Sequence, residues 1–185
     1  MTIVAVVSGP RKDGFSRGIA ERIVAGAESV GKEVKVYCLH NLVPVSDCRN
    51  CGGCKENGGR CVLNDPLTPV LEGIRDAEGI IQVATVNFNH VDGLFKTYFD
   101  RLYCFLDASA SSVLPKGKKI ATAVVSGADE SAAENECAEY EKIMVQHFFC
   151  ESVGRLCYTS WLLPPGQWAD ESILDRAEEL GRNFR

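Results

Sequence analysis

The chain has 185 residues, an apolar fraction of 45 % and a formal net charge of −5. This length suits one domain with a sizeable core. No apolar run approaches the roughly 18 residues that a membrane-spanning helix needs, so we expect no membrane partner. The acidic balance, without any basic block, argues against general nucleic-acid binding.

The first residues, MTIVAVVSGP, form a short apolar run followed by a turn. They lack the basic start and the long apolar stretch of a signal peptide, so we expect a strand here and a cytoplasmic protein. Nine cysteines are many for a chain of this size, and an odd number cannot all form disulfides. We therefore expect a reducing compartment, in which some thiols bind a metal or a cluster.

Apolar strand-like runs alternate with amphipathic helical stretches along the chain. We expect strands at 2–7, 33–39, 79–84, 119–125 and 155–161, and helices at 16–30, 66–76, 94–105, 131–151 and 171–183. Ser16 is the expected cap of the first helix, and Gly31 ends it. The alternation predicts an α/β fold, a flavodoxin-like doubly wound five-stranded parallel sheet in the order 2-1-3-4-5 with helices on both faces.

One stretch, at 40–65, carries no expected strand or helix and holds four of the cysteines. We expect a single domain over 1–185, with this cysteine-rich loop inserted after the second strand. Structureless loops of such length are usually functional.

The segment from Ser8 to Ser16 joins the first strand to the first helix. In open α/β sheets, ligands bind outside the carboxyl ends of the strands, where backbone N–H groups and the helix dipole suit a phosphate. Ser8 and Ser16 offer hydroxyl groups, Arg11 offers a positive charge, and Gly14 allows close approach of the backbone. The segment is neither a P-loop nor a GxGxxG loop, and a polar turn with a helix cap is the plain alternative.

The letters of this segment, SGPRKDGFS, resemble the GSPRKxGNS segment with which the NADPH-dependent FMN reductase superfamily grips the FMN phosphate. Arg11, Gly14 and Ser16 match, whereas Ser8-Gly9 inverts the usual order and Phe15 replaces the usual asparagine. The resemblance spans nearly the whole chain and implies a flavodoxin-like protein that binds FMN. It implies FMN contacts from Ser8, Arg11, Gly14, Phe15 and Ser16.

A second match follows the third strand, where VATVNFNHVDGLFKTYFDRL resembles the family's strand, flavin loop and helix. The usual Pro-x-Tyr is Thr85-Val86-Asn87 here, which alters the ring environment and leaves Phe88 to supply an apolar face. A weaker third match follows the fourth strand. Ordinary turn chemistry is the alternative for both loops. The flavin contacts that the resemblance implies are Thr85, Val86, Asn87, Phe88, Asn89, Ser126, Gly127 and Ala128.

The cysteine loop contains the pattern C-x2-C-x2-C-x6-C, formed by Cys48, Cys51, Cys54 and Cys61. Three cysteines spaced by two can wrap one face of a four-iron cube, and the fourth closes the site. Zinc, which usually takes two separated C-x2-C pairs, and free thiols are the alternatives. The pattern resembles the compact motif of iron–sulfur flavoproteins. That resemblance implies a 4Fe-4S cluster that lies close to FMN, often across a subunit interface, and passes electrons to it.

The other cysteines lie on expected strands or helices, and we expect them to be packing residues: Cys38, Cys104, Cys137, Cys150 and Cys157. His40, His90 and His147 are too scattered for a metal site. His90 adjoins the proposed flavin loop and carries a second hypothesis of a role there, against that of a surface histidine.

Two classes of function stay open. The first is a flavin-dependent oxidoreductase, in which NAD(P)H or a partner such as ferredoxin reduces FMN directly or through the cluster. Within this class, a cluster-free NAD(P)H-dependent FMN or quinone reductase is the alternative. The second class is an electron-transfer carrier without a small substrate, and a flavin-free module with a structural metal is a third possibility. We expect no side-chain nucleophile, and the resemblance implies a homodimer or homotetramer.

Overall fold

The computed structural model describes residues 2–127, 130–159 and 170–185. Its strands form one sheet in the order β2-β1-β3-β5-β6, with the short strand β4 paired to β3. The five strands of the main path run parallel, as predicted, and β4 is an antiparallel addition that the sequence did not indicate. The strands are β1 (Thr2–Val7), β2 (Glu33–Cys38), β3 (Gly79–Asn87), β4 (His90–Val91), β5 (Lys119–Ser126) and β6 (Glu151–Thr159).

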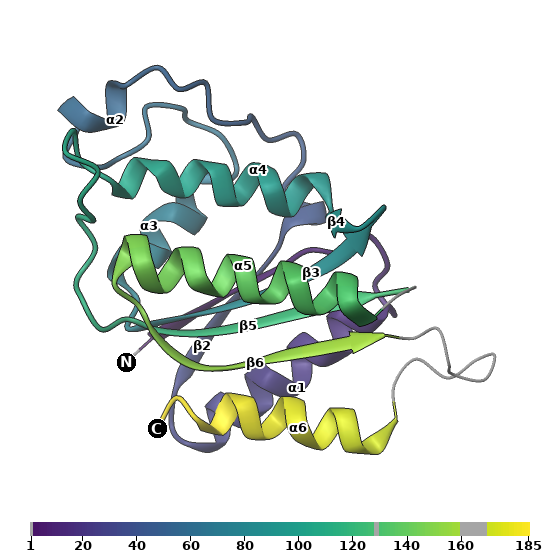
Figure 1. Cartoon of the computed structure of the whole chain (residues 1–185). Coiled ribbons are helices and arrows are strands. Elements are labelled where there is room, and N and C mark those ends of the chain that lie inside the picture. The colour runs from purple at the N-terminus through teal and green to yellow at the C-terminus, as the bar shows by residue number, and fades with distance from the viewer. Residues whose placement is uncertain (1, 128–129, 160–169) are drawn as a thin grey trace.

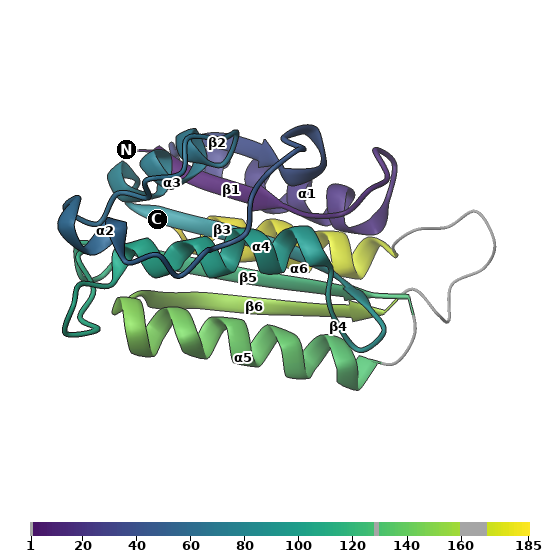
Figure 2. The same ribbon diagram turned by 90° about the horizontal axis from the view of Figure 1, so that it is seen from above.

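The helices form a layer on each face of the sheet (Figure 1 and Figure 2). One layer holds α3, α4 and α5, and the other holds α1 and α6. The α-helices are α1 (Phe15–Ser29), α2 (Gly53–Glu56), α3 (Thr68–Asp76), α4 (Gly93–Arg101), α5 (Glu130–Phe148) and α6 (Glu171–Arg182). Two short 3-10 helices are η1 (Leu39–Asn41) and η2 (Leu102–Phe105).

Strand β1, which lies between β2 and β3, is buried on both faces, because helices cover each face of the sheet and successive side chains of a strand point to opposite faces. Val4 and Val6 pack into the core beneath α3 and α4, while Ile3 and Ala5 pack toward α1 and α6. All four side chains are at most 1 % exposed. An apolar run without alternation is what a strand covered on both faces requires.

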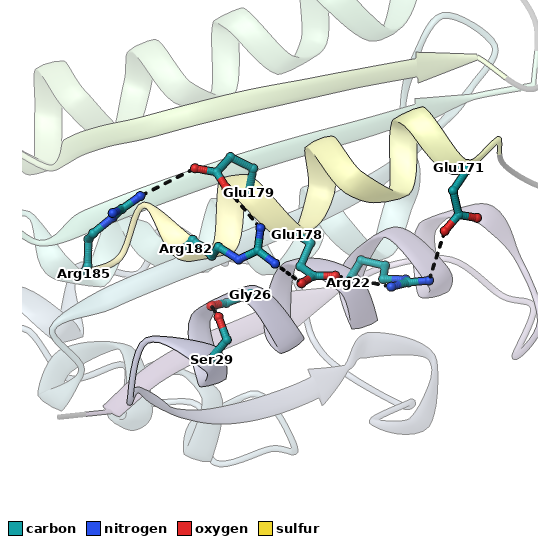
Figure 3. A network of polar contacts seen from close by, with 8 residues as sticks. All are labelled: Arg22, Gly26, Ser29, Glu171, Glu178, Glu179, Arg182 and Arg185. Carbon is teal, nitrogen blue, oxygen red and sulfur yellow. Dashed lines mark hydrogen bonds and ion pairs between the residues drawn. The ribbon is translucent and has the colours of Figure 1, made fainter.

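The helices α1 and α6 meet backbone to backbone. A β-carbon on Gly26 would overlap the carbonyl oxygen of Glu178, and one on Gly181 would overlap the carbonyl oxygen of Ile23. Figure 3 shows a group of ion pairs beside this contact, and in one of them Arg22 Nη1 of α1 lies 3.3 Å from Glu178 Oε2 of α6. The two glycines therefore fix α1, whose N-terminus faces the first loop, against the C-terminal helix.

Several predicted boundaries differ from the structure. The helix predicted at 131–151 ends at Phe148, because Phe149 adopts φ 55°, a left-handed conformation that no sequence signal marked. Strand β6 begins at Glu151, four residues before its predicted start at 155. Its pairing with β5 shifts register near Gly154, which adopts φ 134°, and this irregularity interrupts the strand pattern in the sequence. The predicted end of this strand, at 160–161, lies outside the described residues.

The helix predicted at 94–105 divides into α4 and η2, and the one at 66–76 begins at Thr68. Strand β3 continues to Asn87, three residues beyond its predicted end, because it pairs with β4. Within the loop at 40–65, α2 provides one short helical turn that the sequence did not predict.

Candidate functional site

A cavity of about 240 Å³ opens at the carboxyl ends of β1, β3 and β5. The β1–α1 loop and the β3–β4 hairpin lie at this same edge of the sheet (Figure 1 and Figure 2). We call it the strand-end cavity, and its lining is Pro10, Arg11, Gly14, Phe15, Ser16, Thr85, Asn87, Val125 and Gly127. Three chain segments that are far apart in the sequence thus converge on one space, which is where the sequence placed its flavin loops.

The helix α1 begins at Phe15, and its N-cap is Gly14 in an extended conformation with no side-chain cap. The predicted cap, Ser16, is therefore wrong: it lies inside the first turn and is 5 % exposed. The first turn carries no acidic residue, so its unused N–H groups and the helix dipole suit an anion. Arg11, exposed on the preceding loop, adds a full positive charge.

Ser8 lies beneath the loop rather than on the cavity wall. It is fully buried, its backbone N–H donates to Val83 O at 2.8 Å, and its hydroxyl donates to the Asp92 carboxylate. Asp92 also caps α4 by accepting from Leu94 N and Phe95 N, each at 3.1 Å. Ser8 thus ties the end of β1 to the start of α4, a role that sequence reasoning missed. The signal that could have revealed the role of Asp92 is an aspartate directly before a helical pattern, which is typical of a helix N-cap.

The inverted Ser8-Gly9 order has a backbone reason. Gly9 adopts φ 134°, which L side chains rarely adopt, and a β-carbon there would overlap Ser16 Oγ. It would also lie 3.2 Å from Thr85 Oγ1. Gly9 is therefore a position where the β1–α1 loop packs tightly against the start of α1 and the end of β3, and it was absent from the predicted contacts.

Thr85 is half-buried, and its Oγ1 atom has no hydrogen-bond partner among the described residues. Buried hydroxyl groups are ordinarily paired, so an unpaired one on a cavity wall is the kind of group that a ligand satisfies. Phe15 also lines the cavity, with its ring centroid 6.2 Å from that of Tyr158, and gives the lining an apolar part. The wall therefore combines hydrogen-bonding groups with an apolar surface.

A second cavity of about 400 Å³ adjoins the first and shares Asn87 and Gly127 with it. Its other lining residues are Val86, Phe88, Asn89 and Ser126. The two cavities thus bring together every predicted flavin contact except Ser8 and Ala128, and Ala128 lies outside the described residues.

The β3–β4 hairpin turns through Phe88 and Asn89, both with positive φ, at 49° and 70°. Two such residues match the turn type that suits two-residue hairpins. Phe88 is fully exposed at the tip, at 101 % of its reference area. His90 Nδ1 lies 3.3 Å from Glu136 Oε1 of α5, and Val91 N donates to the same carboxylate at 2.9 Å. His90 thus faces α5 and lines neither cavity.

The four cysteines of the loop line one small pocket at the opposite end of α4. This thiol pocket, which also includes Cys104 and Arg101, encloses about 20 Å³. Cys54 is buried, Cys48 and Cys61 are half-buried, and Cys51 is exposed. Within the part of the chain that the structure describes, no group of three or more His, Cys, Asp or Glu side chains is placed to hold a metal ion.

Arg101 anchors the cysteine loop. Its guanidinium, fully buried, pairs with Asp65 at 2.8 Å and donates to Ser46 O at the same distance. Its Nε atom has no hydrogen-bond partner in the described chain. Burial alone would lower the pKa of Arg101, but hydrogen bonding and charge interaction with Asp65, together with nearby Cys61, raise that pKa. The loop is thus held by a permanent cation whose donors are not all used.

Two cysteines that the sequence predicted as packing residues have thiol neighbours. Cys104 is 3 % exposed, and burial, followed by nearby Cys61 and Cys54, raises its pKa to about 12. It therefore belongs both to the core and to the thiol pocket, where its position on η2 was not foreseen. Cys137 is fully buried, and its Sγ lies 3.4 Å from Thr122 O. A hydrogen bond with Cys157 raises the pKa of Cys137.

Residues 1–149 match the family of NADPH-dependent FMN reductases. The chain belongs to this family. Two curated proteins extend the likeness: an iron–sulfur flavoprotein of Methanosarcina thermophila is 30 % identical over 101 residues, which are 55 % of this chain and 52 % of the relative. An iron–sulfur flavoprotein of Methanocaldococcus jannaschii is 26 % identical over 101 residues, which are 55 % of this chain and 51 % of the relative. The matched part is about half the length of these relatives.

Solved structures resemble this FMN reductase family member over its whole length. The NAD(P)H:quinone oxidoreductase from Methanothermobacter marburgensis has a TM-score of 0.71 at 17 % identity, covering 100 % of this chain and 99 % of that one. An FMN-dependent NADH-azoreductase from Bacillus anthracis, in complex with FMN, has a TM-score of 0.68 at 12 % identity, covering 99 % and 96 %. At these identities the likeness shows the fold alone, and it confirms the predicted fold class.

The described helices include none that combines the length and the hydrophobicity needed to cross a membrane.

Proposed function

We propose that this FMN reductase family member is an FMN-dependent oxidoreductase that a nicotinamide dinucleotide reduces. The observation that carries the proposal is the strand-end cavity, where three separate loops meet beside the N-terminus of α1. Ligands of doubly wound sheets bind at this edge. Membership of the family supports FMN as the ligand.

The residues of the cavity fit FMN. The unused N–H groups at the start of α1 and the charge of Arg11 suit a dianionic phosphate. Gly14 leaves space that a β-carbon would narrow, since such an atom would lie 3.2 Å from Arg11 Cβ. Thr85 Oγ1 offers an unpaired hydrogen-bonding group, and the adjoining cavity beside Asn87 provides room for the flavin ring.

FMN, when bound, supplies the redox chemistry by accepting a hydride from the nicotinamide and giving two electrons to an acceptor. The protein's own groups bind and orient it. Arg11 would neutralise the phosphate, and Thr85 would hold a polar group of the flavin. Phe15 and Val125 would exclude water from one side of the cavity. Buried Asp92 accepts from the Ser8 hydroxyl and from the first turn of α4, so it holds the end of β1 against the start of α4.

For the cysteine loop we propose a 4Fe-4S cluster that exchanges electrons with FMN. The donor set fits: four thiols share one pocket with a buried arginine whose Nε has no partner. Cluster sulfurs accept hydrogen bonds, and these tune the cluster. The pocket of about 20 Å³ is too small for the cluster as it stands, so the loop would have to open. Positive-φ glycines at 52, 58 and 59 would permit that movement.

The distance between the two sites bears on how electrons would pass. The thiol pocket adjoins η2, whereas the strand-end cavity lies at the other end of α4 (Figure 1 and Figure 2). The nine residues of α4 and the four of η2 correspond to roughly 20 Å of helix. A second copy of the chain, in a homodimer or homotetramer, would therefore have to bring its cysteine loop to the flavin of the first.

A second candidate is a reductase without a cluster, in which the four cysteines are free thiols or a zinc site. The observation that favours it is the closed thiol pocket, where the described residues offer no ready group of metal ligands. In that case NAD(P)H would be the donor. With a cluster, a one-electron partner protein such as ferredoxin becomes a suitable donor as well.

Anaerobic purification, followed by absorption spectroscopy and by iron and sulfide analysis, tests both the binding of FMN and the binding of a 4Fe-4S cluster. We expect a flavin spectrum together with about four irons per chain, the content of one 4Fe-4S cluster. A yellow protein without iron would contradict the cluster and support the cluster-free reductase. A colourless protein would contradict the proposal that the chain binds FMN.

A matched pair of variants sharpens the result. Cys54→Ala removes a buried thiol of the pocket, whereas Cys150→Ala removes a buried thiol elsewhere in the same core. We expect Cys54→Ala to lose iron and retain FMN, and Cys150→Ala to retain both. Loss of flavin together with iron from the Cys54→Ala variant would show that the two sites are not separable. Turnover with NADPH, compared with reduction only by ferredoxin, distinguishes an enzyme from an electron carrier.

A further inference from the structure

Two cysteines outside the thiol pocket lie against each other between α5 and β6. Cys137, on α5, is fully buried, and its Sγ lies 4.0 Å from the carbonyl oxygen of Leu156 on β6. Cys157 follows directly and packs against the same core cluster as Cys137. Leu156 and Tyr158, on either side of it, pack on the other face of the sheet. The alternation of the strand therefore points the Cys157 thiol at α5, where it is hydrogen-bonded to Cys137.

Their surroundings give the two thiols different properties. Cys157 is half-buried, whereas Cys137 is 0 % exposed. The hydrogen bond with Cys137 is the main influence that lowers the pKa of Cys157; burial opposes it, and the nearby cation of Arg155 adds to it. Arg155 is held in place by Glu141 of α5, whose Oε2 lies 2.9 Å from the Arg155 Nη1. Because the thiolate is the reactive form of cysteine, Cys157 is the more reactive thiol of the pair.

We propose that Cys137 and Cys157 form a modification site, a dithiol that hydrogen peroxide oxidises to an internal disulfide. The Cys157 thiolate attacks the peroxide, an S–O bond forms, and the O–O bond breaks to release hydroxide, which takes up the proton that Cys157 had lost. Cys137 Sγ then attacks the sulfur of the resulting sulfenic acid. The S–S bond forms as the S–O bond breaks, and water leaves with the proton of Cys137. The two thiols lose two electrons, and one peroxide molecule gains them.

The pair adjoins two contacts that shape the region of the strand-end cavity. Glu136, which directly precedes the cysteine of α5, accepts from Val91 N at 2.9 Å and so holds the β3–β4 hairpin against α5. Tyr158, which directly follows the cysteine of β6, packs its ring against that of Phe15, a residue of the cavity lining. A disulfide would join the two segments that carry these contacts. We therefore expect oxidation to hold the hairpin more firmly against α5.

Peptide mapping of the full chain tests the link. The protein as purified is treated with hydrogen peroxide, its remaining thiols are alkylated, and it is digested with trypsin in the absence of a reductant. The two cysteines then lie in the peptides 120–142 and 156–176, each of which contains no other cysteine. We expect a linked product of these two peptides that separates again when a thiol reductant is added. Recovery of both cysteines as alkylated thiols, or a link of either one to the loop at 40–65, would overturn the proposal.

Three variants assign the roles of the thiols. In Cys137→Ala the sulfenic acid of Cys157 has no thiol to resolve it, so we expect it to accumulate and to be trapped by dimedone. In Cys157→Ala we expect Cys137 to remain a free thiol, because it is buried. Cys150→Ala, which removes a buried thiol of the same core cluster, is the matched control and should form the linked peptides as the parent does. Equal trapping by dimedone in the parent and in Cys137→Ala would overturn the role of Cys137.

Hydrogen exchange measures the effect on the hairpin. The Val91 amide, which donates to Glu136, should exchange several-fold more slowly in the oxidised parent than in the reduced parent. Peroxide should leave its exchange unchanged in Cys157→Ala. Equal exchange in both states of the parent, with the linked peptides present, would overturn the coupling to the hairpin. Neither peptide mapping nor hydrogen exchange requires FMN or a cluster, so failure of this proposal is distinguishable from failure of the proposed function.

Discussion

The strand-end cavity and the thiol pocket are both built on loops, but the two loops are held in different ways. Around the strand-end cavity, the contacts are backbone hydrogen bonds and one short buried side-chain bond: Ser8 N donates to Val83 O and Asp92 N to Thr85 O, each at 2.8 Å, and the Ser8 hydroxyl donates to Asp92. Around the thiol pocket, long cationic side chains bind backbone carbonyl groups between the cysteine loop and its neighbours. Lys55 donates to Tyr103 O at 2.8 Å, and Arg75 donates to Gly59 O.

This difference explains why one site is preformed and the other is closed. Hydrogen bonds between strands and their adjoining loops are part of the fold, so they keep a cavity open in the absence of a ligand. Side-chain anchors instead fix a loop at a few points and leave the intervening backbone to its own contacts. A loop held in this way can reorganise without disturbing the sheet.

The largest effect should follow from removing the main anchor of the cysteine loop. Arg101→Leu leaves the Asp65 carboxylate without its buried partner, and breaking a buried ion pair in this way costs about 3–5 kcal/mol. Urea unfolding measures the loss. Arg60→Leu, which removes an exposed partner of Glu72 on the same loop, should change stability by less than about 1 kcal/mol. Similar small losses for both variants would show that the loop does not depend on Arg101.

The matching test at the strand-end cavity is Gly9→Ala. The added methyl group forces strain at φ 134° and overlap with Ser16, so we expect FMN affinity to fall about tenfold or more. Fluorescence titration with FMN measures it. Gly52→Ala, at a positive-φ glycine in the cysteine loop with open space around it, should leave FMN affinity unchanged. An intact affinity in Gly9→Ala would mean that the loop can relax.

The same contrast explains what could be predicted from the sequence. Strand and helix positions followed from periodicity, and the sheet order followed from the alternation of elements. The residues of the first loop were predicted because ligands bind at the carboxyl ends of parallel strands, whereas those after the third and fourth strands came from the resemblance to the FMN reductase family. Gly9 and Asp92 were missed, because their roles depend on contacts with segments about 75–85 residues away. Cys104 was assigned to packing for the same reason: nothing in its local sequence indicates that η2 faces the cysteine loop.

A pH titration should sharpen the comparison further. Burial alone would raise the pKa of Asp65, but hydrogen bonds from Arg101, Ser46 and Leu67 lower it below its ordinary value. A depressed pKa stabilises the folded state above the ordinary carboxyl pKa of about 3.9, and this contribution is lost as pH falls through the lower, folded value. We therefore expect the stability difference between the parent and Asp65→Asn to shrink below about pH 4. A constant difference down to pH 2 would contradict this.

The smallest effect should come from the hairpin tip. Phe88 is fully exposed and holds a left-handed conformation that costs a side-chain-bearing residue about 1 kcal/mol. Phe88→Gly should raise the free energy of unfolding by up to about 1 kcal/mol, while Phe88→Ala should change it by less than about 0.5 kcal/mol. Thermal unfolding of the two variants distinguishes them. A marked loss of stability in both variants would mean that the Phe88 ring makes stabilising contacts and would contradict this prediction.

The helix that separates the two sites, α4 with its extension η2, acts as a rigid spacer. The first turn of α4 is capped by Asp92 beside the end of β1, and the last residue of α4, Arg101, anchors the cysteine loop. Such a spacer would insulate a redox centre at one end from a redox centre at the other within the same chain. Assembly of two or more copies would then bring the two redox centres together. Protein concentration, rather than any movement within one molecule, would therefore determine whether electrons pass between them.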